Sequence, residues 1–86
     1  MNETDQEFDV TITSPDEQVW AGKVVSVSSE NSAGRFDVLA NHANFITMIQ
    51  NKEIVTRSVD GSDKKFIYKN AVLAVNGGKV NIYSDI

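Results

Sequence analysis

The chemistry open to this chain starts from its single histidine, His42. A hydrolytic site would pair it with a serine nucleophile and a carboxylate, for which the sequence offers Ser26 or Ser28 and Asp37. Such a site needs a base within hydrogen-bond reach of the nucleophile and a pair of donors for the oxyanion. The spacing of these residues does not require that arrangement. We therefore interpret His42 as part of a polar turn, beside turn-forming asparagines, and keep a small hydrolase as the weakest alternative.

Metal and cofactor sites are not indicated by the sequence. One histidine with scattered carboxylates matches no zinc spacing, and the chain has no cysteine. Asp60-Gly61-Ser62-Asp63 lacks the other ligands of a calcium loop and reads better as a solvated hairpin. Gly77-Gly78 lies between two expected strands, whereas a phosphate loop joins a strand to a helix. The sequence predicts no catalytic residue, no metal and no cofactor.

The charge of the chain limits its partners. Twelve acidic against eight basic residues give a net charge of −4. A nucleic-acid binder would need a basic stripe, and docking on an anionic membrane would need a basic patch. The acidic N-terminus does not resemble a signal peptide, and no apolar run approaches the ~18 residues of a membrane span. We expect a soluble intracellular protein with no nucleic-acid partner and no direct membrane insertion.

Short runs of alternating apolar and polar residues must position these side chains, and such alternation is typical of half-buried strands. Strands are expected at 8–13, 19–28, 35–39, 45–49, 54–59, 66–68, 71–75 and 80–82, with a loop at 28–34 and the strongest turn signal at 76–78. A change of phase near Gly22 predicts a bulge or bend. The predicted fold class is all-β, a small β-sandwich of about eight to ten mostly antiparallel strands. It spans 8–86, after a flexible N-terminus at 1–7.

Trp20 has two possible roles. In a core as thin as that of a chain this short, a tryptophan is a large packing element. Tryptophan is also enriched at protein interfaces, so an exposed ring would indicate a partner. We favour packing.

Four motifs follow one another over residues 8–85. They are FDVTITSP at 8–15, VWAGKV at 19–24, AGRFDVLANHANFITMI at 33–49 and FIYKNAVLAVNGGKVNIYSD at 66–85. In this order and spacing they resemble the N-terminal β-sandwich domain of F-type ATP synthase epsilon subunits. Gly34, Leu39, His42 and Ala43 fall on the characteristic positions of the family's best-marked signature.

The resemblance implies a non-catalytic subunit of the central stalk, or rotor, of a rotary ATP synthase. Such a subunit links the gamma subunit to the ring of membrane c subunits and transmits rotation. It lies at the cytoplasmic face of the energy-coupling membrane, and we expect a monomer when it is isolated. The loop 30–37 and the turn 41–44 match the region near these partners, so the implied contact residues are Glu30, Asn31, Arg35, Asp37, Asn41 and His42.

The chain also departs from the family's pattern. Arg35 stands in place of an acid, which suggests that the facing c-ring loop has changed its charge, and Ala40 stands in place of a proline. Asp37 and Asn70-Ala71 stand where the family carries glycines, and an asparagine could replace a glycine by adopting the left-handed conformation. Typical members carry two further helices, which the family uses for inhibition and nucleotide binding. We expect a short form without these activities, either natural or truncated.

The runner-up function is a free-standing sandwich adaptor, unrelated to the synthase, whose exposed edge or loop captures another partner. The two functions differ in one observation. A stalk subunit should co-purify one-to-one with a gamma subunit, whereas an adaptor should not.

Overall fold

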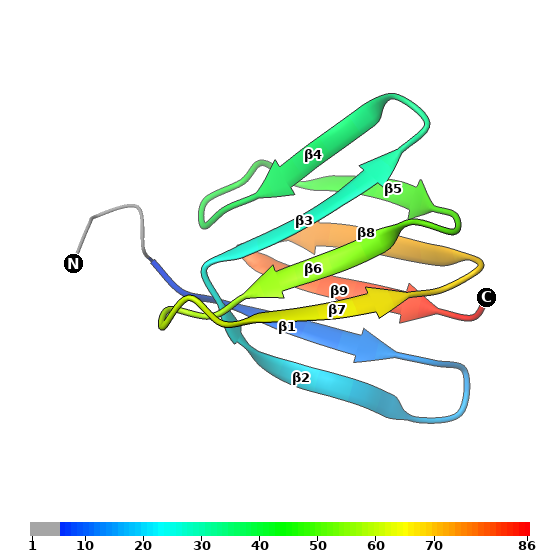
Figure 1. Ribbon diagram of the computed structural model, residues 1–86, viewed down its shortest axis with the longest axis horizontal. Coiled ribbons are helices and arrows are strands. Elements are labelled where there is room, and N and C mark those ends of the chain that lie inside the picture. Colours follow the sequence, from blue (N-terminus) through cyan, green and yellow to red (C-terminus); the bar gives the residue numbers. More distant parts are fainter. Residues whose placement is uncertain (1–5) are drawn as a thin grey trace.

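The computed structural model describes residues 6–86, which form nine strands in two facing sheets (Figure 1). The bounds are β1 (Phe8–Thr13), β2 (Gln18–Val24), β3 (Ser26–Asn31), β4 (Gly34–Val38), β5 (Phe45–Ile49), β6 (Glu53–Arg57), β7 (Asp63–Ile67), β8 (Ala71–Asn76) and β9 (Lys79–Ser84). The all-β sandwich is confirmed. Most of the N-terminus that we expected to be flexible, residues 1–5, lies outside the described residues. The described part holds no helix that could cross a membrane.

One sheet has the order β2-β1-β9-β8-β5 and the other the order β4-β3-β6-β7. Neighbouring strands are antiparallel except for β1 and β9, which run parallel in the middle of the larger sheet. The chain crosses between the sheets at Val25, whose N–H donates to the carbonyl oxygen of Arg57 at 2.7 Å. It crosses again at residues 39–44, between β4 and β5, at 50–52, between β5 and β6, and at 68–70, between β7 and β8.

The core lies between the two sheets and is built by alternate residues of the strands. Ile12, Ile82 and Leu73 are cross-strand neighbours on β1, β9 and β8, and all three are fully buried. The four-stranded sheet contributes Val27, Val38 and other apolar side chains from the opposite side. Because period-two alternation places one set of side chains inward, the runs identified in the sequence supply this core.

The prediction of a loop at 28–34 was wrong. Residues 26–31 form β3, and only Ser32-Ala33 make the turn to β4. Serine-rich sequence resembles a loop, but the inward-facing Ser29 is buried and its hydroxyl donates to the carbonyl oxygen of Glu53 at 2.8 Å. A satisfied hydroxyl can be buried at little cost, so a serine here fills an inward strand position. The expected strand at 19–28 is divided at Val25, where the chain passes from one sheet to the other. This crossing accounts for the change of phase in the apolar alternation of that segment.

The prediction of a bulge or bend at Gly22 was also wrong, since Gly22 pairs in regular register with Val10. The register shift falls at Val19, and Gly22 is small for a different reason. The indole of Trp20 lies over it, and a Cβ at this position would stand 2.7 Å from the ring carbon Cζ2. The same indole packs against Phe66, with ring centroids 5.7 Å apart. Packing, which we favoured for Trp20, is its role within the chain.

This contact predicts the effect of Gly22→Ala. The added methyl group should displace the indole and lower the free energy of unfolding by about 1–3 kcal/mol, the usual cost of overpacking. In a Trp20→Ala background the same change should cost little. Urea denaturation of the four proteins in this double-mutant cycle measures the coupling. Equal costs in both backgrounds would contradict the explanation.

Candidate functional site

Three of the six residues implied by the resemblance share the outer face of the four-stranded sheet. Glu30 on β3 and Arg35 on β4 are cross-strand neighbours. Glu30 also lies 3.9 Å from Lys52, measured from Oε2 to Nζ. Asp37, further along β4, accepts a hydrogen bond from the hydroxyl of Ser28 at 2.5 Å. The β3–β4 hairpin therefore presents charged side chains of both signs to solvent.

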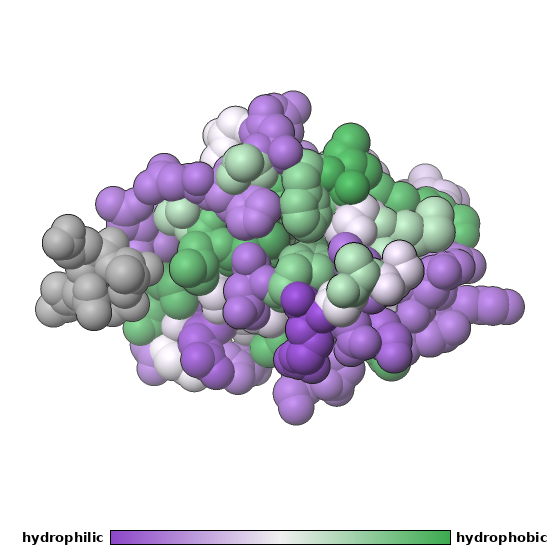
Figure 2. Space-filling view, turned by 90° about the horizontal axis from the view of Figure 1, so that it is seen from above, coloured by the Kyte–Doolittle hydropathy of each residue, from purple (hydrophilic) through white to green (hydrophobic). Residues whose placement is uncertain are grey.

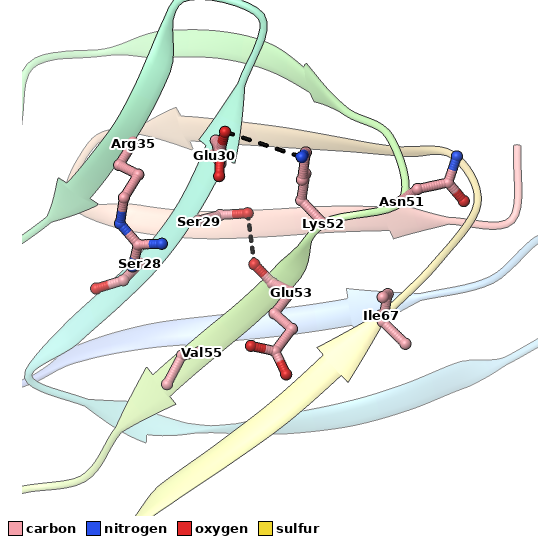
Figure 3. A pocket seen from close by; sticks show the side chains of 9 residues that line it. All are labelled: Ser28, Ser29, Glu30, Arg35, Asn51, Lys52, Glu53, Val55 and Ile67. Carbon is pink, nitrogen blue, oxygen red and sulfur yellow. Dashed lines mark hydrogen bonds and ion pairs between the residues drawn. The ribbon is translucent and has the colours of Figure 1, made fainter.

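These side chains surround a shallow hollow, shown in Figure 3. Its lining is mostly polar and comes from β3, β4, β6, β7 and the turn before β6: Ser28, Ser29, Glu30, Arg35, Asn51, Lys52, Glu53, Val55 and Ile67. Glu30 and Lys52 pair within it, and Arg35 and Glu53 add one further charge of each sign. Across residues 6–86, no group of three or more potential ligand side chains could hold a metal ion. The hairpin is better suited to contacts with a polar surface.

Two more of the six residues lie in the turn between β4 and β5. Asn41 has a left-handed backbone, with φ of 69°, and its side-chain amide donates to Gln6 at 3.2 Å. His42 is partly buried, with Nδ1 2.7 Å from the carbonyl oxygen of Ala43 and its ring edge-on to Phe45 at 5.1 Å. Within the described residues, no hydrogen bond joins His42 to a serine or to Asp37. The catalytic arrangement considered from the sequence is not assembled.

The sixth residue, Asn31, has an internal role. Its amide donates to the hydroxyl of Thr47 on β5 at 2.9 Å, and its side-chain oxygen accepts the N–H of Ala33 at 2.9 Å. One asparagine thus ties β3 to the facing sheet and closes the β3–β4 turn. The six implied residues therefore do not form a single surface.

An apolar surface that sequence reasoning missed lies on the outer face of the five-stranded sheet. Ile46 and Met48 on β5 are 76% and 51% exposed, and Tyr83 on β9 is 45% exposed. Val72 and Ala74 of β8 lie between them in register. We call these five residues the β5 patch. The sequence did carry a signal for this surface. The segments 45–49 and 71–75 place apolar residues on both faces of their strands, whereas a strand that is buried on one side needs apolar residues on that side only.

The free edge of β5 is unlike the other three sheet edges. β7 carries Asp63, Lys64 and Lys65, β4 carries Arg35 and Asp37, and β2 has a register shift and a lysine. Charges and bulges of this kind discourage further strand pairing. β5, with the sequence FITMI, has none of them. Figure 2 looks onto the edge where β4 and β5 lie, and hydrophobic side chains gather there between hydrophilic ones. Exposed apolar area beside an unprotected edge is typical of a surface that a partner covers.

The outer face of the four-stranded sheet also carries a two-point ion pair. Nε of Arg57 lies 2.8 Å from one carboxylate oxygen of Asp63, and a terminal nitrogen lies 3.2 Å from the other. The hydrogen bond from Arg57 lowers the pKa of Asp63 below its ordinary 3.8. A lowered pKa in the folded state contributes stability above the unfolded-state pKa and loses it as the pH falls through the folded value.

Asp63→Asn should therefore reduce the loss of stability on acidification below pH 3.8. The effect should be small, because the pair is solvent-exposed and salt screens it. Melting temperatures measured from neutral pH down to this range would show it as a shallower slope. Asp16→Asn, in the turn before β2, is the matched control. An identical slope change in both variants would contradict a specific role for the pair.

Comparison with known proteins places this sandwich in a family. The model of the ATP synthase delta/epsilon chain β-sandwich domain matches residues 7–86. The chain belongs to this delta/epsilon family. Its curated relatives include ATP synthase epsilon chains from Endomicrobium trichonymphae (33% identical over 78 residues), Clostridium novyi strain NT (31% over 80) and Clostridium botulinum strain Eklund 17B (28% over 78). The alignments cover 91% of this chain but only 56%, 60% and 58% of those relatives.

Solved structures share the delta/epsilon sandwich fold. A chain of the Euglena gracilis mitochondrial ATP synthase (OSCP/F1/c-ring) superposes with a TM-score of 0.83 at 20% identity, covering 91% of this chain and 50% of that one. A chain of the Tetrahymena thermophila mitochondrial ATP synthase (central stalk/c-ring) gives 0.77 at 9% identity, covering 94% and 65%. At these identities the likeness establishes the fold.

Asn70-Ala71 stand where the family carries glycines, and the sequence suggested that the asparagine replaces a glycine by adopting the left-handed conformation. Among the described residues, the non-glycine residues with positive φ are Asn41, Asn51 and Asp85, and Asn70 is not one of them. The N–H of Asp85 donates to the carbonyl oxygen of Asn70 at 3.0 Å, and Ala71 continues as a buried strand residue. The left-handed conformation suggested for Asn70 was wrong. Two other asparagines adopt it instead, Asn41 in the β4–β5 turn and Asn51 in the turn between β5 and β6.

Proposed function

We propose that this domain serves as a non-catalytic central-stalk element of a rotary ATP synthase, where it links the gamma subunit to the c ring and transmits rotation. The observation that carries the proposal is the match of the delta/epsilon sandwich model to residues 7–86, effectively the whole described fold. The complex would hold the domain at the cytoplasmic face of the energy-coupling membrane, with no membrane insertion of its own.

A link between two partners needs two separate surfaces, and the sandwich has them on opposite faces. The β5 patch lies outside the five-stranded sheet, and the charged β3–β4 hairpin lies outside the four-stranded sheet. Apolar interface cores suit long-lived association, so we assign the β5 patch to the gamma subunit. The hairpin, with Glu30, Arg35 and Asp37, is assigned to the polar loops of the c ring.

Transmission of torque also requires that the two surfaces move as one body. β4 and β5 are sheet edges that share no ladder, so the sandwich could open along this side. Phe36 and Phe45 meet there edge-to-face, with centroids 5.5 Å apart, and the hydrogen bond from Asn31 to Thr47 lies on the same side. Aromatic pairs of this geometry contribute about 0.5–1.5 kcal/mol beyond their buried area. These contacts couple the surface on β5 to the hairpin.

Co-expression with the gamma subunit from the same genome tests the function. A stalk domain should co-purify with gamma at one-to-one stoichiometry, and the isolated chain should sediment as a monomer. Failure to co-purify, together with capture of a different protein on the β5 patch, would favour the free-standing adaptor. The test should include this chain and any longer native form.

A second test concerns Arg35, which stands where the family carries an acid. If the facing c-ring loop has changed its charge to match, Arg35→Glu should bring like charges together and weaken assembly on the c ring without weakening gamma binding. ATP-driven proton or sodium pumping by the reconstituted complex is the readout. Unchanged assembly and coupling would remove the support for this charge match.

A further inference from the structure

The β8–β9 hairpin contains a chemically labile residue pair. Asn76 is the only asparagine in the sequence that precedes a glycine. It is exposed, ends β8 and pairs with Lys79, while Gly77 and Gly78 form the two-residue loop with φ of 61° and 79°. A glycine has no side chain to shield its backbone nitrogen, and both loop positions need its conformational freedom. The hairpin geometry therefore keeps an unshielded nitrogen next to the amide of Asn76.

This pair can rearrange without any added reagent except water. The nitrogen of Gly77 bonds to the side-chain carbonyl carbon of Asn76, the bond from that carbon to the side-chain nitrogen breaks, and ammonia leaves with the displaced proton. The resulting five-membered imide is opened by water at either carbonyl. One opening gives aspartate, and the other gives isoaspartate, in which the main chain runs through the former side chain. No electrons are gained or lost.

A distant residue engages the attacking nitrogen. The N–H of Gly77 donates to the side-chain oxygen of Asn44 at 3.0 Å, across 33 residues of sequence. While this bond is made, the proton stays on the nitrogen of Gly77, and a protonated amide nitrogen does not attack a carbonyl carbon. The pairing of Asn76 with Lys79 adds a second restraint, because it holds Asn76 in an extended conformation.

We infer that Asn76 is a site of spontaneous deamidation and that Asn44 protects it. The product has consequences for the fold and for the surface beside it. Isoaspartate lengthens the main chain by one atom inside a two-residue hairpin, which this turn type cannot absorb without a change of register. Either product also adds a negative charge to a hollow that Asn76 lines together with Ile46 and Ala74 of the β5 patch.

The test compares aged samples of four proteins by peptide mass spectrometry: the wild type, Asn44→Ala, Asn44→Asp and Asn41→Ala. Loss of one neutral hydrogen bond raises the population of the open state roughly fivefold, so Asn44→Ala should deamidate at position 76 about fivefold faster. Asn44→Asp retains an oxygen acceptor and should stay close to the wild-type rate. Asn41→Ala alters the same turn without touching Gly77, so its deamidation rate at position 76 should also stay close to that of the wild type.

A parallel incubation in urea separates protection from unfolding. In the unfolded chain the Asn44 bond is absent, so all four rates at Asn76 should be equal. Faster reaction of Asn44→Ala in buffer only, confined to Asn76, supports the inference. Equal native rates for Asn44→Ala and the wild type would overturn it. So would a rise at every asparagine of Asn44→Ala, because that result would indicate general unfolding.

Discussion

Replacing Leu73 with alanine is expected to lower the free energy of unfolding by about 3 kcal/mol. Leu73 is 0% exposed and lies in the middle of β8, in register with Ile82 and, through it, with Ile12. These neighbours on β9 and β1 cannot collapse into the space left by the side chain without breaking their own ladders. A domain of this length has about 4–13 kcal/mol of total stability, so the variant should approach the limit of folding at 37 °C.

Urea denaturation followed by far-UV circular dichroism measures this loss. Met48→Ala is the matched control, because Met48 lies on the neighbouring strand β5 with its side chain outward. It should cost about 0.5 kcal/mol or less, as surface changes usually do. Equal losses in the two variants would mean that the two faces of the five-stranded sheet are not divided into core and surface as described.

The second large effect concerns the β5 patch. Ile46→Lys combined with Met48→Lys should weaken gamma binding by roughly 30-fold or more, the usual loss for central interface residues. Both side chains point to solvent, so the isolated domain should remain folded. Two lysines also supply the edge protection that β5 lacks. The loss should be visible in co-purification and in the dissociation rate of the complex.

Val19→Lys combined with Ala21→Lys is the control for this experiment. It adds the same charge to exposed positions of β2, at the opposite edge of the same sheet. It should leave gamma binding within a few-fold of the wild type. If both double variants bind gamma as the wild type does, gamma uses another surface and the assignment of the β5 patch fails. If only the β2 variant loses binding, gamma binds at the β2 edge of the sheet and not at the β5 edge.

Local sequence determined those features that depend on neighbouring residues along the chain. Alternation in FDVTIT and AVLAV identified β1 and β8, because period-two side-chain geometry needs no knowledge of the partner strand. Gly77-Gly78 identified the last hairpin, because its positive φ angles suit glycine. The order of four motifs identified the delta/epsilon family, which the family model then confirmed.

The tertiary structure alone decided which residues face one another. Ser26–Asn31 became a strand because the buried Ser29 finds a carbonyl on β6, a partner 24 residues away. Gly22 is needed beneath an indole two residues before it, and no bulge is required. The six residues taken from the family separated into a charged hairpin, an internal tie at Asn31 and a turn at Asn41 and His42. The β5 patch became visible only when both faces of β5 and β8 were assigned. The physical reason is the same in each case. Alternation along the chain shows only which side chains share a face of a strand. Which face is buried depends on long-range strand pairing, which is determined by the summed packing of all nine strands.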